Sequence, residues 1–171
     1  MLEVSDLFVR AAVLSGDRVY RYTLSRYWGE GDRMVWIMLN PSTADAEVDD
    51  PTIRRCMGFA RREGCRSIDV INLYALRATK PKHLLDHPDP EGPDNPLAWA
   101  MALFDPEPAL VVAAWGAHAG MPGLPVSRAL TGFCSSAWCL GTTKEGAPRH
   151  PLYVKADEPL VPFSAWNEGG S

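Results

Sequence analysis

Four largely apolar segments, separated by helical or turn-forming stretches, constrain the fold of this chain more than any other feature. They are MVWIMLN at 34–40, SIDVINL at 67–73, LVVAAWG at 110–116 and SAWCLG at 136–141. Such runs are typical of strands that are buried on both faces. Strands that alternate with helices form βαβ units with right-handed crossovers. The pattern therefore predicts a three-layer α/β/α domain with a mainly parallel central sheet.

The segments between these strands carry helix signals. Asp50 can cap a helix that begins at Pro51, continues through TIRRCMGFARRE and stops at Gly64. Two more helices are predicted, one near LAWAMALF at 97–104 and one over residues 126–131.

A β-hairpin precedes this alternation. Its turn is the pair Gly16-Asp17, and its second strand alternates apolar Tyr20, Tyr22 and Leu24 with polar Arg21, Thr23 and Ser25. We expect a single domain over residues 1–171, made of an N-terminal hairpin (1–28), an α/β core (34–155) and a C-terminal strap or tail (156–171).

Composition excludes several classes of protein. The 171 residues are 46% hydrophobic and 22% charged, which is ordinary for a globular domain, and no stretch approaches the ~18 apolar residues of a membrane helix. The first residues, MLEVSDLFVR, lack the basic and apolar regions of a secretory signal, so a cytoplasmic location away from membranes is predicted. The net charge of −4 argues against a strongly basic nucleic-acid binder. Basic residues nevertheless gather within 54–82, and they form either a phosphate-attracting face or an ordinary solvated one.

Neither the cysteines nor the acidic residues form a metal-binding motif. Cys56, Cys65, Cys134 and Cys139 lack CxxC spacing and a Cys/His set, so buried free thiols are expected. The acidic run at 45–50 could bind magnesium, but the electrostatics of a helix N-terminus explains its last two aspartates. We predict no metal and no cofactor.

Polar residues stand at the ends of the predicted strands. Asn40, Asn72 and the pair Trp115-Gly116 lie at the ends of three of them, and in α/β sheets ligands bind beyond the carboxyl ends of the strands. An immobilised Asn can orient a water or read the edge of a base, because its amide both donates and accepts. His150, followed by Pro151, can donate a hydrogen bond to an oxygen that becomes negative.

The order of these motifs resembles known families. LNPSTAD, DPT-R-C, NL-ALRAT, WG and HPLY identify the chain as a member of the largely bacterial family catalogued as domain of unknown function 1643. More distantly, IMLNPS, VINLYALRAT, AAWGAHA and RHPLY resemble, in the same order, the motifs of the uracil-DNA glycosylase superfamily. That resemblance implies a parallel sheet flanked by helices, hydrolysis of an N-glycosidic bond in DNA or a nucleotide, and a role in DNA repair.

The resemblance also implies roles for individual residues. Asn40 corresponds to the Asn that positions water, Asn72 to the Asn that reads the base, and His150 to the His that hydrogen-bonds the departing base. Base flipping would bring a base from a duplex into the pocket. Substrate-binding residues would also include Pro41, Ser42, Thr43, Tyr74, Trp115, Gly116 and Leu152, and candidate phosphate contacts are Arg54, Arg55, Arg77, Lys80 and Arg149.

Two features depart from the superfamily pattern, and other roles stay open. The last motif reads His-Pro-Leu-Tyr without the usual Ser, and Ser42-Thr43 replace the residues that follow the first Asn-Pro. Asn40 could instead serve the turn, Asn72 a buried polar network, and His150 a structural role. A non-catalytic module that binds a nucleic acid or nucleotide, or a hydrolase of a small nucleoside-like metabolite, would fit the same residues.

Overall fold

A seven-stranded mixed sheet forms the centre of the molecule. The computed structural model describes residues 8–131 and 136–163, and within them the strand order is β1-β2-β4-β3-β5-β6-β7. The bounds are β1 (Val9–Leu14), β2 (Arg21–Tyr27), β3 (Arg33–Met38), β4 (Ser67–Asn72), β5 (Leu110–Ala113), β6 (Trp138–Cys139) and β7 (Val161–Pro162). Neighbours within β4-β3-β5-β6 are parallel, whereas β1, β2 and β7 pair antiparallel.

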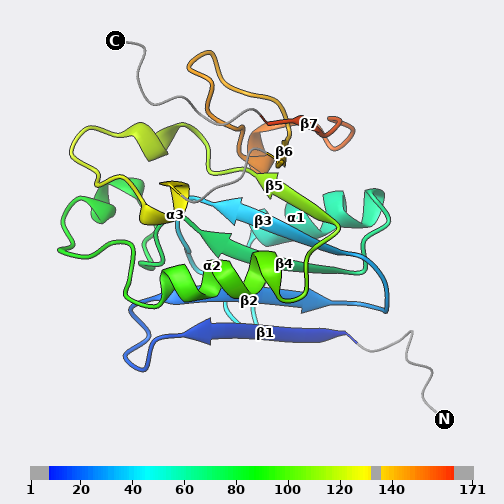
Figure 1. Ribbon diagram of the computed structural model, residues 1–171, viewed down its shortest axis with the longest axis horizontal. Helices are drawn as coiled ribbons and strands as arrows, with labels where there is room; N and C mark the ends of the chain where they lie inside the picture. Colours follow the sequence, from blue (N-terminus) through cyan, green and yellow to red (C-terminus); the bar gives the residue numbers. More distant parts are fainter. Residues whose placement is uncertain (1–7, 132–135, 164–171) are drawn as a thin grey trace.

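The prediction of a mixed α/β fold is confirmed, but a mainly parallel sheet is not. The N-terminal hairpin does not stand apart from the core, because β2 pairs directly with β4 and extends the sheet at one edge. At the other edge the chain returns as β7 beside β6 (Figure 1). Residues 1–7 of the predicted hairpin segment, Cys134, and residues 164–171 of the predicted C-terminal strap or tail lie outside the described residues.

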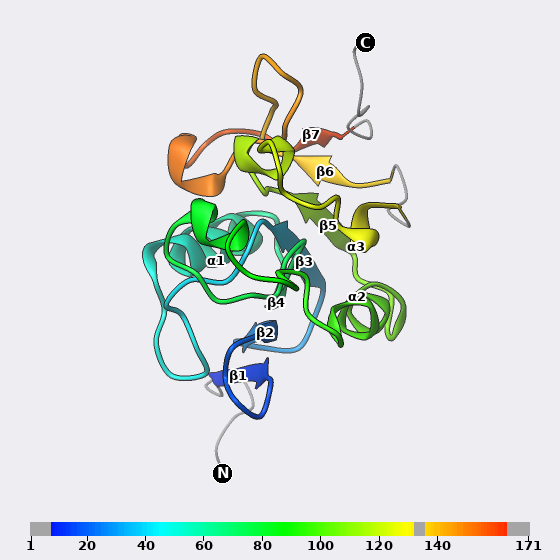
Figure 2. The same ribbon diagram turned by 90° about the vertical axis from the view of Figure 1, so that its left-hand side faces the viewer.

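The helices are α1 (Pro51–Arg62), α2 (Asn95–Phe104) and α3 (Arg128–Thr131), with short 3-10 turns η2 (Pro81–Leu84), η3 (Ala117–Gly120) and η4 (Pro151–Tyr153). As predicted, Asp50 caps α1, and its Oδ1 accepts a hydrogen bond from the Ile53 N–H at 2.9 Å. The third helix is shorter than predicted. Figure 2 shows the central strands between α1 on one side and α2 on the other.

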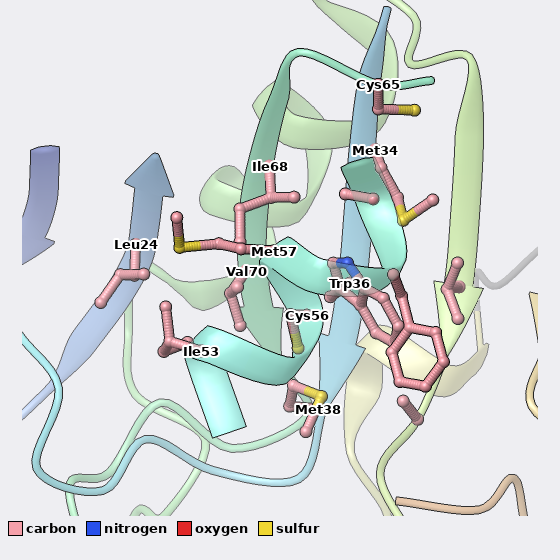
Figure 3. Packing of buried hydrophobic residues seen from close by; sticks show 14 of the residues in the cluster. Leu24, Met34, Trp36, Met38, Ile53, Cys56, Met57, Cys65, Ile68 and Val70 are labelled. Carbon is pink, nitrogen blue, oxygen red and sulfur yellow. The ribbon is translucent and has the colours of Figure 1, made fainter. Parts of the chain in front are cut away.

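Alternation along the central strands divides the core into two clusters. In β3, Met34, Trp36 and Met38 pack with α1, whereas Val35 and Ile37 pack with residues of α2 on the opposite face. This is the period of two that a pleated strand imposes. Figure 3 shows the first cluster, with the side chains of β3, β4 and α1 interleaved.

A β-bulge changes the direction of Arg21. The sequence alternation predicted Arg21 on the face of Thr23 and Ser25. In the structure, Val13 pairs with Thr23 but Leu14 pairs with Arg21, so Tyr22 is an extra residue in β2. Because the bulge shifts the alternation, Arg21 lies on the α1 face, where it is only 3% exposed.

A second arginine of β2 anchors the loop that leads into α1. The side chain of Arg26 is fully buried, and its Nε donates to the Asp49 carboxylate at 2.7 Å. Its Nη2 donates to the Asp45 carbonyl at 2.6 Å, and its Nη1 to the Ser25 carbonyl at 2.8 Å. These bonds fix residues 45–49 against the sheet and so set where α1 begins.

We expect Arg26→Ala to lower the free energy of unfolding by about 3 kcal/mol, because it leaves a largely buried carboxylate without its buried partner and only a distant, exposed one. Arg10 contacts the same Asp49 at 3.6 Å but is half exposed, so Arg10→Ala should cost no more than about 0.5 kcal/mol. Urea unfolding of both variants measures the difference. Equal losses in the two variants would contradict this account of the loop.

Candidate nucleobase pocket

A pocket of about 450 Å³ opens at the carboxyl ends of β3, β4 and β5. It lies beside the first turn of α1 and beside η4, and Arg55 of α1 donates a hydrogen bond to the Pro151 carbonyl of η4. Residues from four separate motifs of the sequence line it. The predicted site residues among them are Asn40, Ser42, Asn72, Trp115, Gly116, Arg149, His150 and Leu152.

The alternation of the strands explains why the pocket is on this face. Ile68 and Val70 of β4 face α1, and Asn72 continues the same row. Met38, Ile53 and Val70, which Figure 3 labels in the core, also line the pocket and give it an apolar wall. The pocket is therefore an extension of the space between the sheet and α1.

Asn72 combines burial with an unused amide. It is 1% exposed, and neither its Nδ2 nor its Oδ1 has a hydrogen-bond partner within the described residues. Its backbone is firmly held from the α2 side, because its carbonyl accepts from Asn95 Nδ2 at 3.0 Å and from Trp99 Nε1 at 2.9 Å. Buried polar groups in native proteins are nearly always paired. A fixed amide without a partner, at the wall of a pocket, is therefore a ready hydrogen-bonding site for a ligand.

The amide of Asn40 is partly used by the protein. Its Nδ2 donates to the carbonyls of Ala78 at 2.8 Å and Pro41 at 3.0 Å, and Ala78 N–H donates back to the Pro41 carbonyl. The side chain thus ties the loop after β3 to the loop after β4. With the nitrogen committed, Oδ1 is the group that Asn40 can offer to a water or ligand.

Hydrogen bonding fixes the tautomer of His150. The side chain caps η4, and its Nδ1 accepts a hydrogen bond from the Leu152 N–H at 3.2 Å. Nδ1 is therefore unprotonated, and in the neutral ring Nε2 carries the proton. Burial lowers the pKa of His150 below its usual value, against a smaller opposing effect of the Asp50 carboxylate. His150 is thus a neutral Nε2–H donor at pH 7.

Backbone bonds connect the His150 loop to the rest of the pocket. Gly116, which follows β5, donates its N–H to the Pro148 carbonyl at 2.9 Å. Its φ of +75° is a conformation that favours glycine. From α1, Arg55 donates its Nε to the Pro151 carbonyl at 3.1 Å and also bonds the Val154 carbonyl. The guanidinium of Arg55 therefore supports η4.

Several predicted site residues lie outside the pocket lining. Pro41 is buried and Thr43 is exposed, while Tyr74 is buried in the α2-side cluster and donates its hydroxyl to the Pro125 carbonyl. Arg77 is partly buried and donates to the Arg18 carbonyl. Arg54 and Lys80 are exposed, which leaves them accessible to a polyanion.

Sequence reasoning missed some residues of the lining. Arg21, Thr52, Thr143 and Tyr153 are among them, and Asp50 lines the pocket in addition to capping α1. Tyr153 belongs to the HPLY motif and could have been included, whereas a bulge that turns Arg21 inward leaves no readable signal. His118, which follows β5, also lines the pocket.

The Asp45 carboxylate is hydrogen-bonded to the backbone, and three cysteines are buried. Within the described ranges, no three His, Cys, Asp or Glu residues are grouped to hold a metal, and the Asp45 carboxylate accepts from the N–H groups of Glu47 and Val48. Cys56, Cys65 and Cys139 are buried free thiols, and burial raises the pKa of each. In the same part of the chain, no helix has the length and apolar character to cross a membrane.

We expect the imidazole of His150 to titrate below pH 6.5 in NMR spectra, with the Nε2–H tautomer above that pH. The folded state binds this proton more weakly than the unfolded state. The stability that neutral His150 contributes is therefore fully present above pH 6.5. This contribution is lost as pH falls through the lowered pKa. Asp50→Asn keeps a capping side chain but removes the opposing charge, so it should lower the pKa of His150 further. A rise of that pKa in the variant would contradict this electrostatic account.

Comparison with known proteins places the chain in a family. It matches the family described as Protein of unknown function (DUF1643) over residues 21–152, which includes every predicted catalytic residue. No curated protein and no solved structure matches the chain. The protein belongs to the DUF1643 family.

Proposed function

We propose that this DUF1643 protein binds a nucleobase in the pocket and hydrolyses an N-glycosidic bond, in DNA or in a nucleotide. The observation that carries the proposal is the buried, unpartnered amide of Asn72 at the pocket wall. An amide offers one acceptor and two donors in a plane, which matches the edge of a base. A similar arrangement of motifs in the uracil-DNA glycosylase superfamily supports the proposal, and with it a three-layer α/β/α fold of that type.

The chemistry of the proposed reaction needs stabilisation of a leaving group. As the bond between the sugar carbon and the base nitrogen breaks, the base takes the electron pair and positive charge develops on the sugar. His150 Nε2–H would donate a hydrogen bond to the base as it becomes negative, because the neutral ring with an unprotonated Nδ1 carries its proton on Nε2. Desolvation in the pocket would strengthen that bond.

A water must then attack the sugar carbon. Asn40 Oδ1 would accept a hydrogen bond from this water and hold it, since the amide nitrogen is fixed by Ala78 and Pro41. Asp50, which also lines the pocket, would receive the proton that the water releases. The departing base is finally protonated from solvent or by way of Asp50, which balances the reaction.

We expect Asn40→Ala and His150→Ala each to lower the rate of base release about a hundredfold or more, as removal of one oriented hydrogen-bonding group costs about 3 kcal/mol of barrier. The substrates are oligonucleotides with uracil, hypoxanthine, mismatched thymine or modified bases, and the matching free nucleosides and nucleotides. Abasic sites and released bases are measured. His83→Ala, an exposed histidine outside the pocket lining, is the matched control.

The outcomes of this assay separate the candidate functions. Equal activity in the parent and both variants would remove the catalytic assignment. Binding that depends on Asn72, with no base release from any substrate, would favour a non-catalytic binding module. Turnover of free nucleosides alone would favour a hydrolase of small metabolites.

Salt dependence tests whether the partner is DNA. We expect oligonucleotide binding to weaken steeply with rising salt, because basic side chains that neutralise phosphates release counterions. Replacing exposed Arg54 and Lys80 together by Gln should make the slope of log K against log[salt] shallower by about 1 for each phosphate that the double variant no longer neutralises. An unchanged slope in the double variant would remove these two residues as DNA contacts.

A further inference from the structure

Two arginines of β2 are buried on the same face of the sheet but are bonded very differently. Arg26 has a carboxylate partner and carbonyl acceptors for its other nitrogens. Arg21, which is 3% exposed, donates its Nη1 to the Ala44 carbonyl at 2.6 Å, while its buried Nε has no partner among the described residues. Within that part of the chain, no carboxylate lies at ion-pair distance from Arg21.

A buried guanidinium without an anionic partner is costly, so it calls for an explanation. The pKa of Arg21 is lowered to about 10, mainly by burial and to a smaller extent by Arg77 and Arg26, while Asp50 and Asp45 oppose. Arg21 therefore stays charged at neutral pH. Neither nearby carboxylate forms an ion pair with Arg21: one oxygen of Asp50 caps α1, and Asp45 accepts from the loop backbone. With Nη1 taken by Ala44, the edge formed by Nε and Nη2 is the fork that can bind an anion side-on.

The strand order places Arg21 at one end of the pocket. Arg21 is on β2, Asn72 on the neighbouring β4, Asn40 after β3, and Gly116 after β5. At a strand spacing of about 4.8 Å, β2 and β5 are roughly 14 Å apart. His150 is tied to the β5 end by the bond between Gly116 and Pro148. Asn72 therefore lies between Arg21 and His150.

We infer that the ligand carries an anionic group, a carboxylate or a phosphate, on the side of the base that points away from His150, and that Arg21 binds it. This inference rests on the proposed function, since it takes the base to be held at Asn72. A neutral base bound alone would leave the charge of Arg21 without an anionic partner. A carboxylate on the base itself and the phosphate of a small nucleotide share this chemistry.

Matched pairs of probes test the inference by calorimetric binding to the full chain, without any need for turnover. Uracil is compared with orotate, which carries a carboxylate on the ring, and uridine, inosine and guanosine are each compared with their 5′-monophosphates. We expect the anionic member of at least one pair to bind at least tenfold more tightly than its neutral partner. A preference confined to orotate identifies a carboxylate on the base, and one confined to the monophosphates identifies a phosphate.

Variants assign the preference to Arg21. Arg21→Gln should reduce it to twofold or less without weakening the neutral member, whereas Asn72→Ala should weaken both members of the pair alike. Arg61→Gln removes the same charge from an exposed residue of α1 outside the pocket and should leave the preference intact. If Arg21→Gln does not fold, as judged by circular dichroism, Arg21→Lys keeps the charge without the fork and should still reduce the preference at least threefold.

Two results would overturn the inference. One is the absence of any pair in which the anion binds more tightly, and the other is a preference that survives replacement of Arg21. Neither depends on hydrolysis. Base release without an anion preference would support the proposed function and rule out the anion site. An anion preference without base release would support the anion site and rule out the proposed hydrolysis.

Discussion

The parallel register between β3 and β4 is the constraint on which the pocket depends. Met38 lies opposite Asn72, so the two strands end at the same level, and the loops that follow them start side by side. Backbone bonds continue beyond the strands, from Leu73 N–H to the Met38 carbonyl and from Tyr74 N–H to the Leu39 carbonyl. The side chain of Asn40 then joins the loops at Ala78. A shift of one residue would turn Asn72 to the α2 face and close the site.

Four polar side chains line the pocket, and they differ in how many of their hydrogen bonds the protein itself supplies. Asn40 gives its nitrogen to the fold and keeps its oxygen. His150 uses one ring nitrogen in a cap and keeps the other, which makes it a neutral donor. Asn72 keeps its whole amide, and Arg21 keeps the Nε edge of its guanidinium. Asn72 and Arg21 are also buried, at 1% and 3% exposed, and burial strengthens each polar contact that they could make with a ligand.

The supports of the site come from outside it. Asn95 and Trp99 of α2 hold the backbone of Asn72 from the opposite face of the sheet, and Arg55 of α1 holds the backbone of η4. Arg26 fixes the loop that precedes α1. Asn95, Trp99 and Arg55 act through backbone carbonyls, so the side chain of Asn72 at the pocket is left without a bond to the described protein. Such rigid support is what a site needs if its groups are to meet a ligand without reorganisation.

The sequence by itself determined the local elements and the convergence of three polar side chains. Continuous apolar runs marked the strands, Asp50-Pro51 marked the start of α1, and the positions of Asn40 and Asn72 at the ends of strands implied a common edge. These features depend on residues that are close together in the sequence and on the two-residue period of a strand, so they can be recognised from the sequence. Only the tertiary structure decided that the hairpin joins the sheet antiparallel to β4, and that a bulge at Tyr22 turns Arg21 into the pocket. Edge pairing and bulges depend on which strands meet and in what register, and those contacts join residues far apart in the sequence.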